Sequence, residues 1–407
     1  MKSTFPTLFL KPGRERSVQN RHPWIFDGAV ARIDGSPGNG AVVQVCDARG
    51  AALAWAHLSL HSKIRARVLD FAPDAVMNEN WWRRKIAAAI SRRNAIERPP
   101  HPALSPKGEG NAVRLIFAEA DGLPGLIVDQ FGEFLVVQFQ TAGMDAEKNR
   151  ITNMLAELLK PRGIFERSEE DSRAREGLGA SVGVLYGETP PANYQFREGD
   201  LQIGIDIAHG QKTGWYLDQR VNRARVRAHA AEKNVLDAFS YTGGFALAAL
   251  HGGATHVTRL DASAAALAQG TTNLRANHFA ENVDATICGD AFDELRTLRA
   301  AEKHFDLIIL DPPKFAASKH EVDRALRGYK DINLQALQLL TPGGLLATFS
   351  CSGNISAEQF QIMLYWAAKD AQCDVQIIER FTQSDDHPVL LTFPESEYLK
   401  GLLVRKV

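Results

Sequence analysis

The chain has 407 residues, 45% of them apolar and 23% charged, a balance that is typical of folded soluble proteins and excludes disordered, collagen-like and coiled-coil chains. At roughly 100 to 200 residues per domain, this length predicts two or three domains. The net charge of -1 is unevenly distributed, because residues 1–100 carry sixteen Lys and Arg against eight Asp and Glu. This basic segment is either a module that faces a polyanion or an ordinary solvated surface.

The sequence shows no pattern typical of a membrane segment or a zinc site. No apolar run approaches the ~18 residues of a membrane-spanning helix, and residues 1–12 lack the basic-then-apolar order of a signal peptide. The cysteines are too far apart for a CxxC pattern; they are Cys46, Cys288, Cys351 and Cys373. We therefore expect a cytoplasmic protein with no metal, no disulfide framework and no membrane partner.

In chain order, the first expected unit is a small β-barrel or sandwich. Short apolar runs over 41–46, 51–56 and 64–69 are separated by turn residues, which is typical of such folds. A basic amphipathic helix over 78–97 and a Pro- and Gly-rich linker over 99–111 follow. The basic residues of this helix, which we expect to contact phosphates, are Arg83, Arg84, Lys85, Arg92 and Arg93.

A second block has the pattern of a compact α+β domain. We expect strands over 113–118, 126–129 and 134–139, a helix over 145–159 and a further strand over 164–167.

After residue 190 the pattern changes to strands that alternate with helices. The expected strands are 234–238, 256–261, 284–287, 305–311, 345–350, 374–379 and 402–405. The expected helices are 243–251, 263–277, 290–302, 321–340 and 356–371. Apolar runs such as 307–310 are typical of a parallel sheet covered on both faces. We predict an α/β protein with domains over 1–75, 76–190 and 191–407, the last one Rossmann-like.

Acidic residues end the strands of this predicted sheet, at the edge where open α/β sheets bind ligands. They are Asp237, Asp261, Asp290 and Asp311. The turn after the first strand contains Tyr241, Thr242, Gly243, Gly244 and Phe245. It lacks the GxGxxG pattern that holds a pyrophosphate, and the carboxylates would attract a sulfonium cation but repel a diphosphate. The pattern favours S-adenosylmethionine over a dinucleotide, with Asp261 as a ribose acceptor and Asp290 as either an adenine acceptor or a helix N-cap.

Two strand ends carry candidate reactive groups. Asp311 precedes two prolines that fix its backbone, and its carboxylate can accept from an amino group of a base. Cys351 follows the next strand, so both residues should face one pocket. A thiolate that adds to C6 of a pyrimidine makes C5 nucleophilic enough to take a methyl group, and Cys351 could supply this thiolate. The alternative is that Cys351 is a small buried hydrophobe, as most lone cysteines are. We expect that role for the other three cysteines.

Eight short segments together resemble a known family. They are HPWIF (22–26), DGLPGL (121–126), KTGWYLDQR (212–220), FSYTGGF (239–245), DPPKF (311–315), RGYKDIN (327–333), FSCSG (349–353) and DHP (386–388). They are similar to segments of the bacterial large-subunit ribosomal RNA cytosine-C5 methyltransferases that carry an N-terminal PUA domain.

The resemblance implies a PUA domain, a central α+β domain and a class I methyltransferase domain that uses S-adenosylmethionine. It also implies large-subunit ribosomal RNA as the partner, Cys351 as the nucleophile, and Asp218 and Gln219 in the cofactor pocket. Better-known RNA cytosine-C5 enzymes carry a second cysteine after the strand-end proline, where this chain has Pro313 and Lys314, so the group that takes the C5 proton stays open.

Several alternatives remain open at this point. Asp311 with its prolines also resembles the motif of methyltransferases that act on an exocyclic amine of guanine or adenine. Another alternative is a noncatalytic RNA-binding ribosome-assembly factor that retains the fold without the activity. A homodimer is neither predicted nor excluded. The arginines that follow Gln219 face either RNA or solvent; they are Arg220, Arg223, Arg225 and Arg227.

Overall fold

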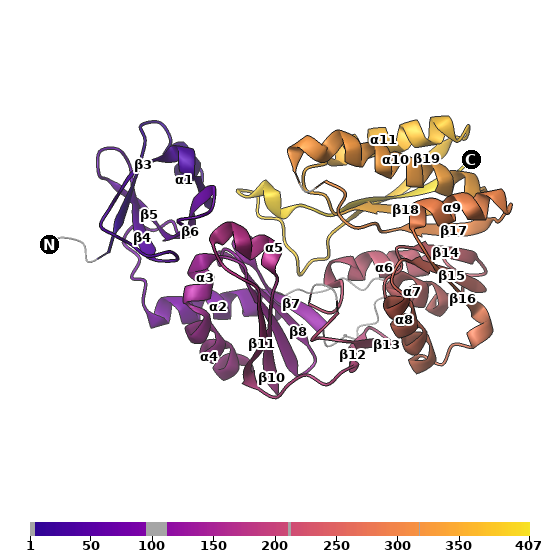
Figure 1. The fold of residues 1–407 in the computed structure, drawn as a ribbon, viewed down its shortest axis with the longest axis horizontal. Helices are drawn as coiled ribbons and strands as arrows, with labels where there is room; N and C mark the ends of the chain where they lie inside the picture. The colour runs from indigo at the N-terminus through magenta and orange to yellow at the C-terminus, as the bar shows by residue number, and fades with distance from the viewer. Residues whose placement is uncertain (1–4, 95–111, 211–212, 317) are drawn as a thin grey trace.

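The structure is a computed structural model that describes residues 5–94, 112–210, 213–316 and 318–407. Its first part is a six-stranded sheet with the order β2-β6-β5-β4-β1-β3 (Figure 1). The elements are β1 Thr7–Leu10, α1 Arg16–Gln19, β2 Trp24–Phe26, β3 Val30–Asp34, β4 Val42–Cys46, β5 Ala52–Leu58 and β6 Ile64–Asp70. The three predicted strands correspond to β4, β5 and β6. The sequence did not predict β1, β2 and β3, which are short and pair with strands distant in the chain.

Helix α2, Glu79–Asn94, confirms the predicted amphipathic helix as far as the structure describes it. Residues 95–97 and the predicted linker over 99–111 lie outside the described residues. Trp81, Trp82 and Ile86 of α2 are buried in the core of the second sheet. Whether the five basic residues of α2 contact phosphates stays a prediction, although four of them pair with carboxylates in the structure. These pairs are Arg83–Glu157, Lys85–Asp70, Arg92–Asp121 and Arg93–Asp121.

The central sheet has the strand order β11-β10-β9-β8-β7. Its elements are β7 Ala112–Phe117, β8 Leu126–Phe131, β9 Phe134–Phe139, α3 Ala142–Ala146, α4 Lys148–Leu159, β10 Gly163–Ser168, α5 Glu170–Arg173 and β11 Ser181–Gly187. The predicted helix over 145–159 is divided into α3 and α4, and β11 was not predicted. Strand β9 is buried along its whole length, since Leu135 and Val137 pack with α2 and α4 while Phe134 and Val136 join the core of the C-terminal part.

A hairpin of β12, Tyr194–Glu198, and β13, Leu201–Ile205, connects the central sheet to the C-terminal part. The sequence did not predict it. Phe196 and Ile203 share one apolar core with Phe131 of the central sheet and Val235 of the C-terminal sheet. The hairpin therefore holds these two sheets together.

The C-terminal part confirms the predicted Rossmann-like fold (Figure 1). Its seven strands have the order β16-β15-β14-β17-β18-β20-β19. They are β14 Asn234–Ala238, β15 His256–Asp261, β16 Asp284–Cys288, β17 Phe305–Leu310, β18 Leu340–Ser350, β19 Val375–Thr382 and β20 Lys400–Lys406. Strand β20 is antiparallel to both neighbours, whereas β14 to β18 pair in parallel.

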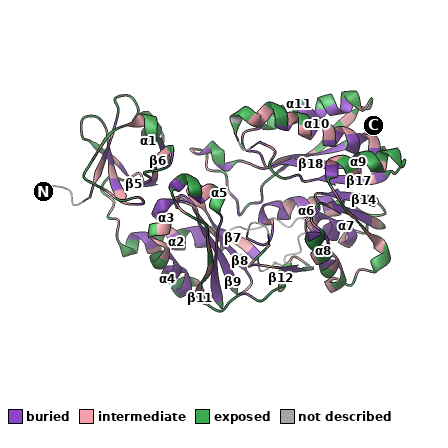
Figure 2. Ribbon diagram, viewed as in Figure 1, coloured by how far each residue is buried: buried purple, intermediate pink, exposed green. Residues whose placement is uncertain are grey.

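Helices cover both faces of this sheet, as predicted. They are α6 Arg220–Ala228, α7 Gly244–His251, α8 Ala264–Ala276, α9 Ala291–Ala300, α10 Val322–Leu339 and α11 Ala357–Asp370. One core contains residues of α6, α7 and α8, and the other contains residues of α9, α10 and α11. Buried residues accordingly run along the strands of the central and C-terminal sheets (Figure 2). Within the described residues, no helix combines the length and the apolar character that crossing a membrane requires.

Candidate functional site

A cavity of about 540 Å³ opens at the carboxyl ends of β14, β15, β17 and β18. Ten of the predicted site residues line it: Asp218, Gln219, Tyr241, Thr242, Gly244, Phe245, Asp261, Asp290, Asp311 and Cys351. Two others, Asp237 and Gly243, are not among the lining residues. The parallel strands bring these segments together because their carboxyl ends share one edge of the sheet.

Asp237 lies beneath the cavity wall instead of in it. Its side chain is buried, and Oδ2 accepts a 2.9 Å hydrogen bond from the backbone N–H of Ala246 in the first turn of α7. Burial raises the pKa of Asp237 to about 7, although this hydrogen bond acts in the opposite direction. Asp237 therefore orients the start of α7.

The turn between β14 and α7 has an unusual backbone. Phe239 and Tyr241 adopt positive φ angles of 62° and 49°, and Gly243, the N-cap of α7, has a φ of 78°. A Cβ atom at Gly243 would lie 3.1 Å from Cδ of Arg259. Gly243 is thus required for the turn, while its neighbours Thr242 and Gly244 form the cavity wall.

Backbone amides hold two of the predicted acidic residues. Asp261 accepts 2.8 Å and 2.9 Å hydrogen bonds from the N–H groups of Tyr241 and Ser263. Asp290 caps α9 by accepting a 2.8 Å bond from the N–H of Phe292. Asp290 therefore has the N-cap role and also lines the cavity, so the two interpretations of this residue are compatible.

Cys351 and Asp311 follow neighbouring parallel strands in which Leu310 is in register with Thr348. Cys351 is half-buried, and its Sγ lies 4.0 Å from the carbonyl oxygen of Pro312. The remaining cysteines, Cys46, Cys288 and Cys373, do not line the cavity. The expectation that all three are buried is confirmed only for Cys46, because Cys288 is exposed and Cys373 is half-buried. Burial raises the pKa of the Cys46 and Cys373 thiols, which makes them poorer nucleophiles.

The sequence analysis missed a lysine that supports the Cys351 loop. Lys400 of β20 donates hydrogen bonds of 2.8 Å and 2.7 Å to the carbonyl oxygens of Ser352 and Ile355. Burial lowers the pKa of Lys400 to about 8. Strand β20 pairs antiparallel with β18, and Lys400 lies opposite Ser350, the residue before Cys351. This pairing places the Lys400 ammonium group beside the Cys351 loop.

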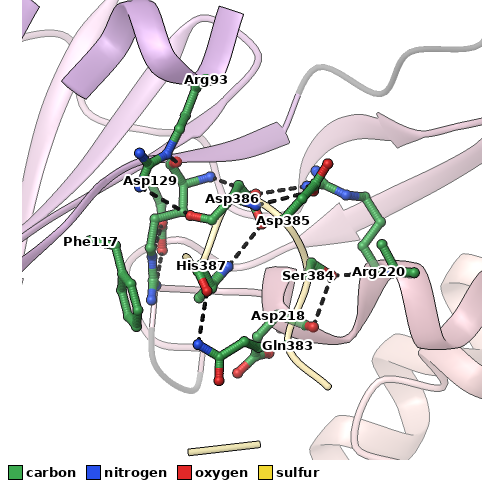
Figure 3. Close-up of polar contacts among 12 residues, drawn as sticks. Arg93, Phe117, Asp129, Asp218, Arg220, Gln383, Ser384, Asp385, Asp386 and His387 are labelled. Carbon is green, nitrogen blue, oxygen red and sulfur yellow. Dashed lines mark hydrogen bonds and ion pairs between the residues drawn. The ribbon is translucent and has the colours of Figure 1, made fainter. Parts of the chain in front are cut away.

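Two residues from the end of the chain hold Asp218, and no sequence pattern pointed to them. The Tyr398 hydroxyl donates a 2.5 Å hydrogen bond to Oδ2 of Asp218. Ser384 donates from its N–H and its hydroxyl to the carbonyl oxygen of Asp218, both at 2.9 Å (Figure 3). Both the side chain and the main chain of Asp218 are therefore fixed.

The sequence left open whether the arginines of α6 face RNA or solvent, and both alternatives are wrong for two of them. Arg220 is buried and lies 2.7 Å from a carboxylate oxygen of Asp386. Arg223 is also buried and pairs with Glu198 of the hairpin at 2.5 Å. These two residues join α6 to other parts of the chain.

Comparison with known proteins assigns the chain to a family. A model described as S-adenosylmethionine-dependent methyltransferase matches residues 175–405, and one described as PUA-like domain matches residues 8–71. Over 403 residues, the chain is 42% identical to the ribosomal RNA large subunit methyltransferase I of Klebsiella pneumoniae subsp. pneumoniae, with 99% of each chain covered. The chain belongs to this methyltransferase family. The Serratia proteamaculans protein of the same name is also 42% identical, over 98% of each chain.

Solved structures share the fold of this family member. A methyltransferase from Streptococcus mutans has a TM-score of 0.82 and 21% identity, with 98% of this chain and 99% of that chain covered. A methyltransferase structure in complex with SAH has a TM-score of 0.83 and 22% identity over the same shares. The cofactor of the family is S-adenosylmethionine, which confirms the choice against a dinucleotide.

The residues around the cavity fit this cofactor. Four carboxylates, those of Asp218, Asp261, Asp290 and Asp311, line one cavity, and together they favour a ligand with a positive charge. The same arrangement would repel a pyrophosphate.

Proposed function

We propose that this protein methylates C5 of a cytosine in large-subunit (23S) ribosomal RNA through a covalent adduct with Cys351. The observation that carries the proposal is that Cys351 and Asp311 line the same cavity as the carboxylates suited to the cofactor. The ribosomal RNA substrate is the one that the names of the 42% identical relatives state. The PUA-like sheet, which lies within the basic first 100 residues, would supply phosphate contacts.

The residues have distinct roles in this reaction. Asp311 orients the base by accepting from the amino group of cytosine. The Cys351 thiolate forms a bond to C6, and the electrons of the C5–C6 double bond become available at C5. S-adenosylmethionine would supply the electrophilic methyl group that C5 takes, with its sulfur–methyl bond breaking to leave neutral S-adenosylhomocysteine. Loss of the C5 proton to a base then re-forms the double bond, and the bond between Sγ and C6 breaks.

The division into a PUA domain over 1–75, a central domain over 76–190 and a methyltransferase domain over 191–407 belongs to the same proposal. The sheets fall within these ranges. In this arrangement the first domain binds RNA, and the last carries the chemistry.

Mass mapping of nucleosides tests the proposal. Ribosomal RNA that lacks the modification is incubated with the protein and labelled S-adenosylmethionine, digested, and analysed for methylated nucleosides. We expect 5-methylcytidine at one position of 23S RNA. A label on an amino nitrogen of guanine or adenine would instead establish the exocyclic-amine alternative, in which Asp311 is the central residue, and binding of RNA without any methylation would indicate the noncatalytic alternative.

A further inference from the structure

The segment after β19, residues 383–399, contacts three parts of the molecule, and we call it the strap. In Figure 1 it is the yellow segment that leaves the C-terminal sheet and extends toward the first sheet. Its two ends reach Asp218 at the cavity through Ser384 and Tyr398. Leu399 at the end of the strap lines the cavity, whereas Ser384 and Tyr398 do not. These two residues therefore act on the cavity through Asp218.

The first part of the strap is fixed to the central sheet by the buried carboxylate of Asp386. Asp386 accepts a 3.0 Å hydrogen bond from the N–H of Arg114 in β7 and pairs with Arg220 of α6 (Figure 3). Arg93 of α2 donates to the carbonyl oxygen of Asp386 at 3.3 Å. The strap therefore joins α2, the central sheet and the turn that holds Asp218.

The tip of the strap packs on the first sheet. The buried ring of Phe393 contacts the ring of Trp24 edge-on, with centroids 4.7 Å apart. Glu395 lies 3.3 Å from Nε2 of His22. Trp24 also donates to Glu119 of the central part at 2.8 Å. The tip thus has specific contacts with the PUA-like sheet.

Internal hydrogen bonds make the strap one unit. Gln383 donates to the carbonyl oxygens of His387 and Ser396, both at 2.8 Å, and accepts from the N–H of Tyr398 at 3.1 Å. At the tip, the N–H of Phe393 donates to the carbonyl oxygen of Leu390 at 2.7 Å. These hydrogen bonds link the two ends of the strap near Asp218 to each other and to the segment that carries Phe393 at its tip.

We propose that the strap positions Asp218 for binding the cationic methyl donor and couples this position to the seating of the PUA-like sheet. Tyr398 and Ser384 are positioning residues, and Phe393 is the anchor on the first sheet. The inference rests on the proposed function, because it takes S-adenosylmethionine as the ligand of the cavity and RNA as the ligand of the PUA-like sheet. A coupling of this kind acts in both directions.

The first test measures S-adenosylmethionine affinity by calorimetry in the full chain. Tyr398→Phe removes only the hydroxyl that holds Asp218, and we expect Kd and KM for the methyl donor to rise on the order of fivefold while kcat changes little. Ser384→Ala, which keeps the backbone hydrogen bond, should give a smaller increase. Tyr194→Phe is the matched control, because its hydroxyl accepts from the N–H of Glu133 and its removal should leave Kd unchanged.

A double-mutant cycle separates positioning from general destabilisation. If Tyr398 acts through Asp218, adding Tyr398→Phe to Asp218→Ala should not weaken binding further. An additive loss in the double variant, or a Kd for Tyr398→Phe equal to that of the wild type, would overturn the positioning role.

The second test addresses the link to the first sheet. We expect bound RNA to raise the S-adenosylmethionine affinity of the wild type, and Phe393→Leu should reduce this increase although Phe393 does not line the cavity. A wild-type protein that binds both ligands independently would refute the coupling and leave the proposed function intact. A wild-type protein that neither binds the methyl donor nor methylates RNA would instead refute the proposed function.

Discussion

Arg220 and Asp386 form a buried ion pair in which Nη2 lies 2.7 Å from Oδ2. The pair joins α6 to the strap, and neighbouring groups from the central sheet and α2 complete its surroundings (Figure 3). A buried charge that loses its partner is strongly destabilising. Without the Asp386 carboxylate, buried Arg220 would keep only its longer, 3.6 Å pair with the more exposed Asp385.

The pH dependence of this junction can be predicted. Burial alone would raise the pKa of Asp386, but Arg220 and His387 outweigh burial and hold this pKa well below its usual range. A depressed folded-state pKa stabilises the protein above the unfolded value of about 4, and this stabilisation is lost as the pH falls further. We expect Asp386→Asn to lower the free energy of unfolding by about 3 kcal/mol at pH 7.

Urea unfolding at pH 7 and below pH 4 measures this effect. The difference between the wild type and Asp386→Asn should shrink at the lower pH, where the Asp386 carboxylate of the unfolded wild type becomes protonated while that of the folded state stays ionised. The control is Asp34→Asn, whose exposed pair with Arg32 should contribute less than about 1 kcal/mol. An equal difference at both pH values would contradict the prediction.

Cys351→Ala should abolish methylation and leave S-adenosylmethionine binding intact, because only the attack on C6 needs the thiol. Methyl transfer from labelled cofactor and calorimetry measure the two properties. Cys46→Ala, Cys288→Ala and Cys373→Ala are the controls, and we expect them to retain activity. RNA with 5-fluorocytosine at the target should leave an adduct that resists denaturation, since fluorine blocks the loss of a proton from C5. Wild-type turnover of Cys351→Ala without such an adduct would exclude the C5 mechanism.

Asp261→Ala should weaken S-adenosylmethionine binding by about 1 to 3 kcal/mol if its carboxylate accepts from the ribose hydroxyls. The amides of Tyr241 and Ser263 already fix this carboxylate, so little reorganisation is needed on binding. Calorimetric titration gives the affinity, with exposed Asp293 replaced by Ala as the control. Detectable binding of NADH but not of S-adenosylmethionine would show that the cavity takes a different cofactor.

RNA affinity should fall steeply with salt, whereas S-adenosylmethionine affinity should change little, because phosphate contacts release counterions. Removing residues 1–98 would also remove Trp81 and Trp82 from the central core, so exposed charges are the better target. The salt dependence is the slope of the logarithm of RNA affinity against the logarithm of salt concentration. We expect the double change Arg14→Gln and Arg16→Gln to reduce this slope by about 1 for each phosphate that these side chains neutralise in the wild type. The matched control is Arg299→Gln with Lys303→Gln, at the opposite edge of the C-terminal sheet from the cavity. If this control changes the slope as much as the Arg14 and Arg16 variant does, a specific role of the first sheet is refuted.

Local sequence patterns were sufficient for the Rossmann-like fold and for most of the cavity wall. The apolar run of β17 and the helical spacing of α10 are short-range features. The carboxyl ends of parallel strands lie at one edge, so Asp261, Asp311 and Cys351 could be placed near one another once their strands were recognised.

Only the tertiary structure decided the features that depend on contacts between distant segments. The sequence predicted Asp237 as a cavity residue, but α7 packs over it and takes its carboxylate as a hydrogen-bond acceptor. Arg220 is buried because Asp386 reaches it from the strap, and Lys400 lies beside the Cys351 loop because β20 pairs with β18. Side-chain periodicity reports which face of an element is buried, but it does not identify the partner that covers that face. Strand order and the path of the strap set these partners.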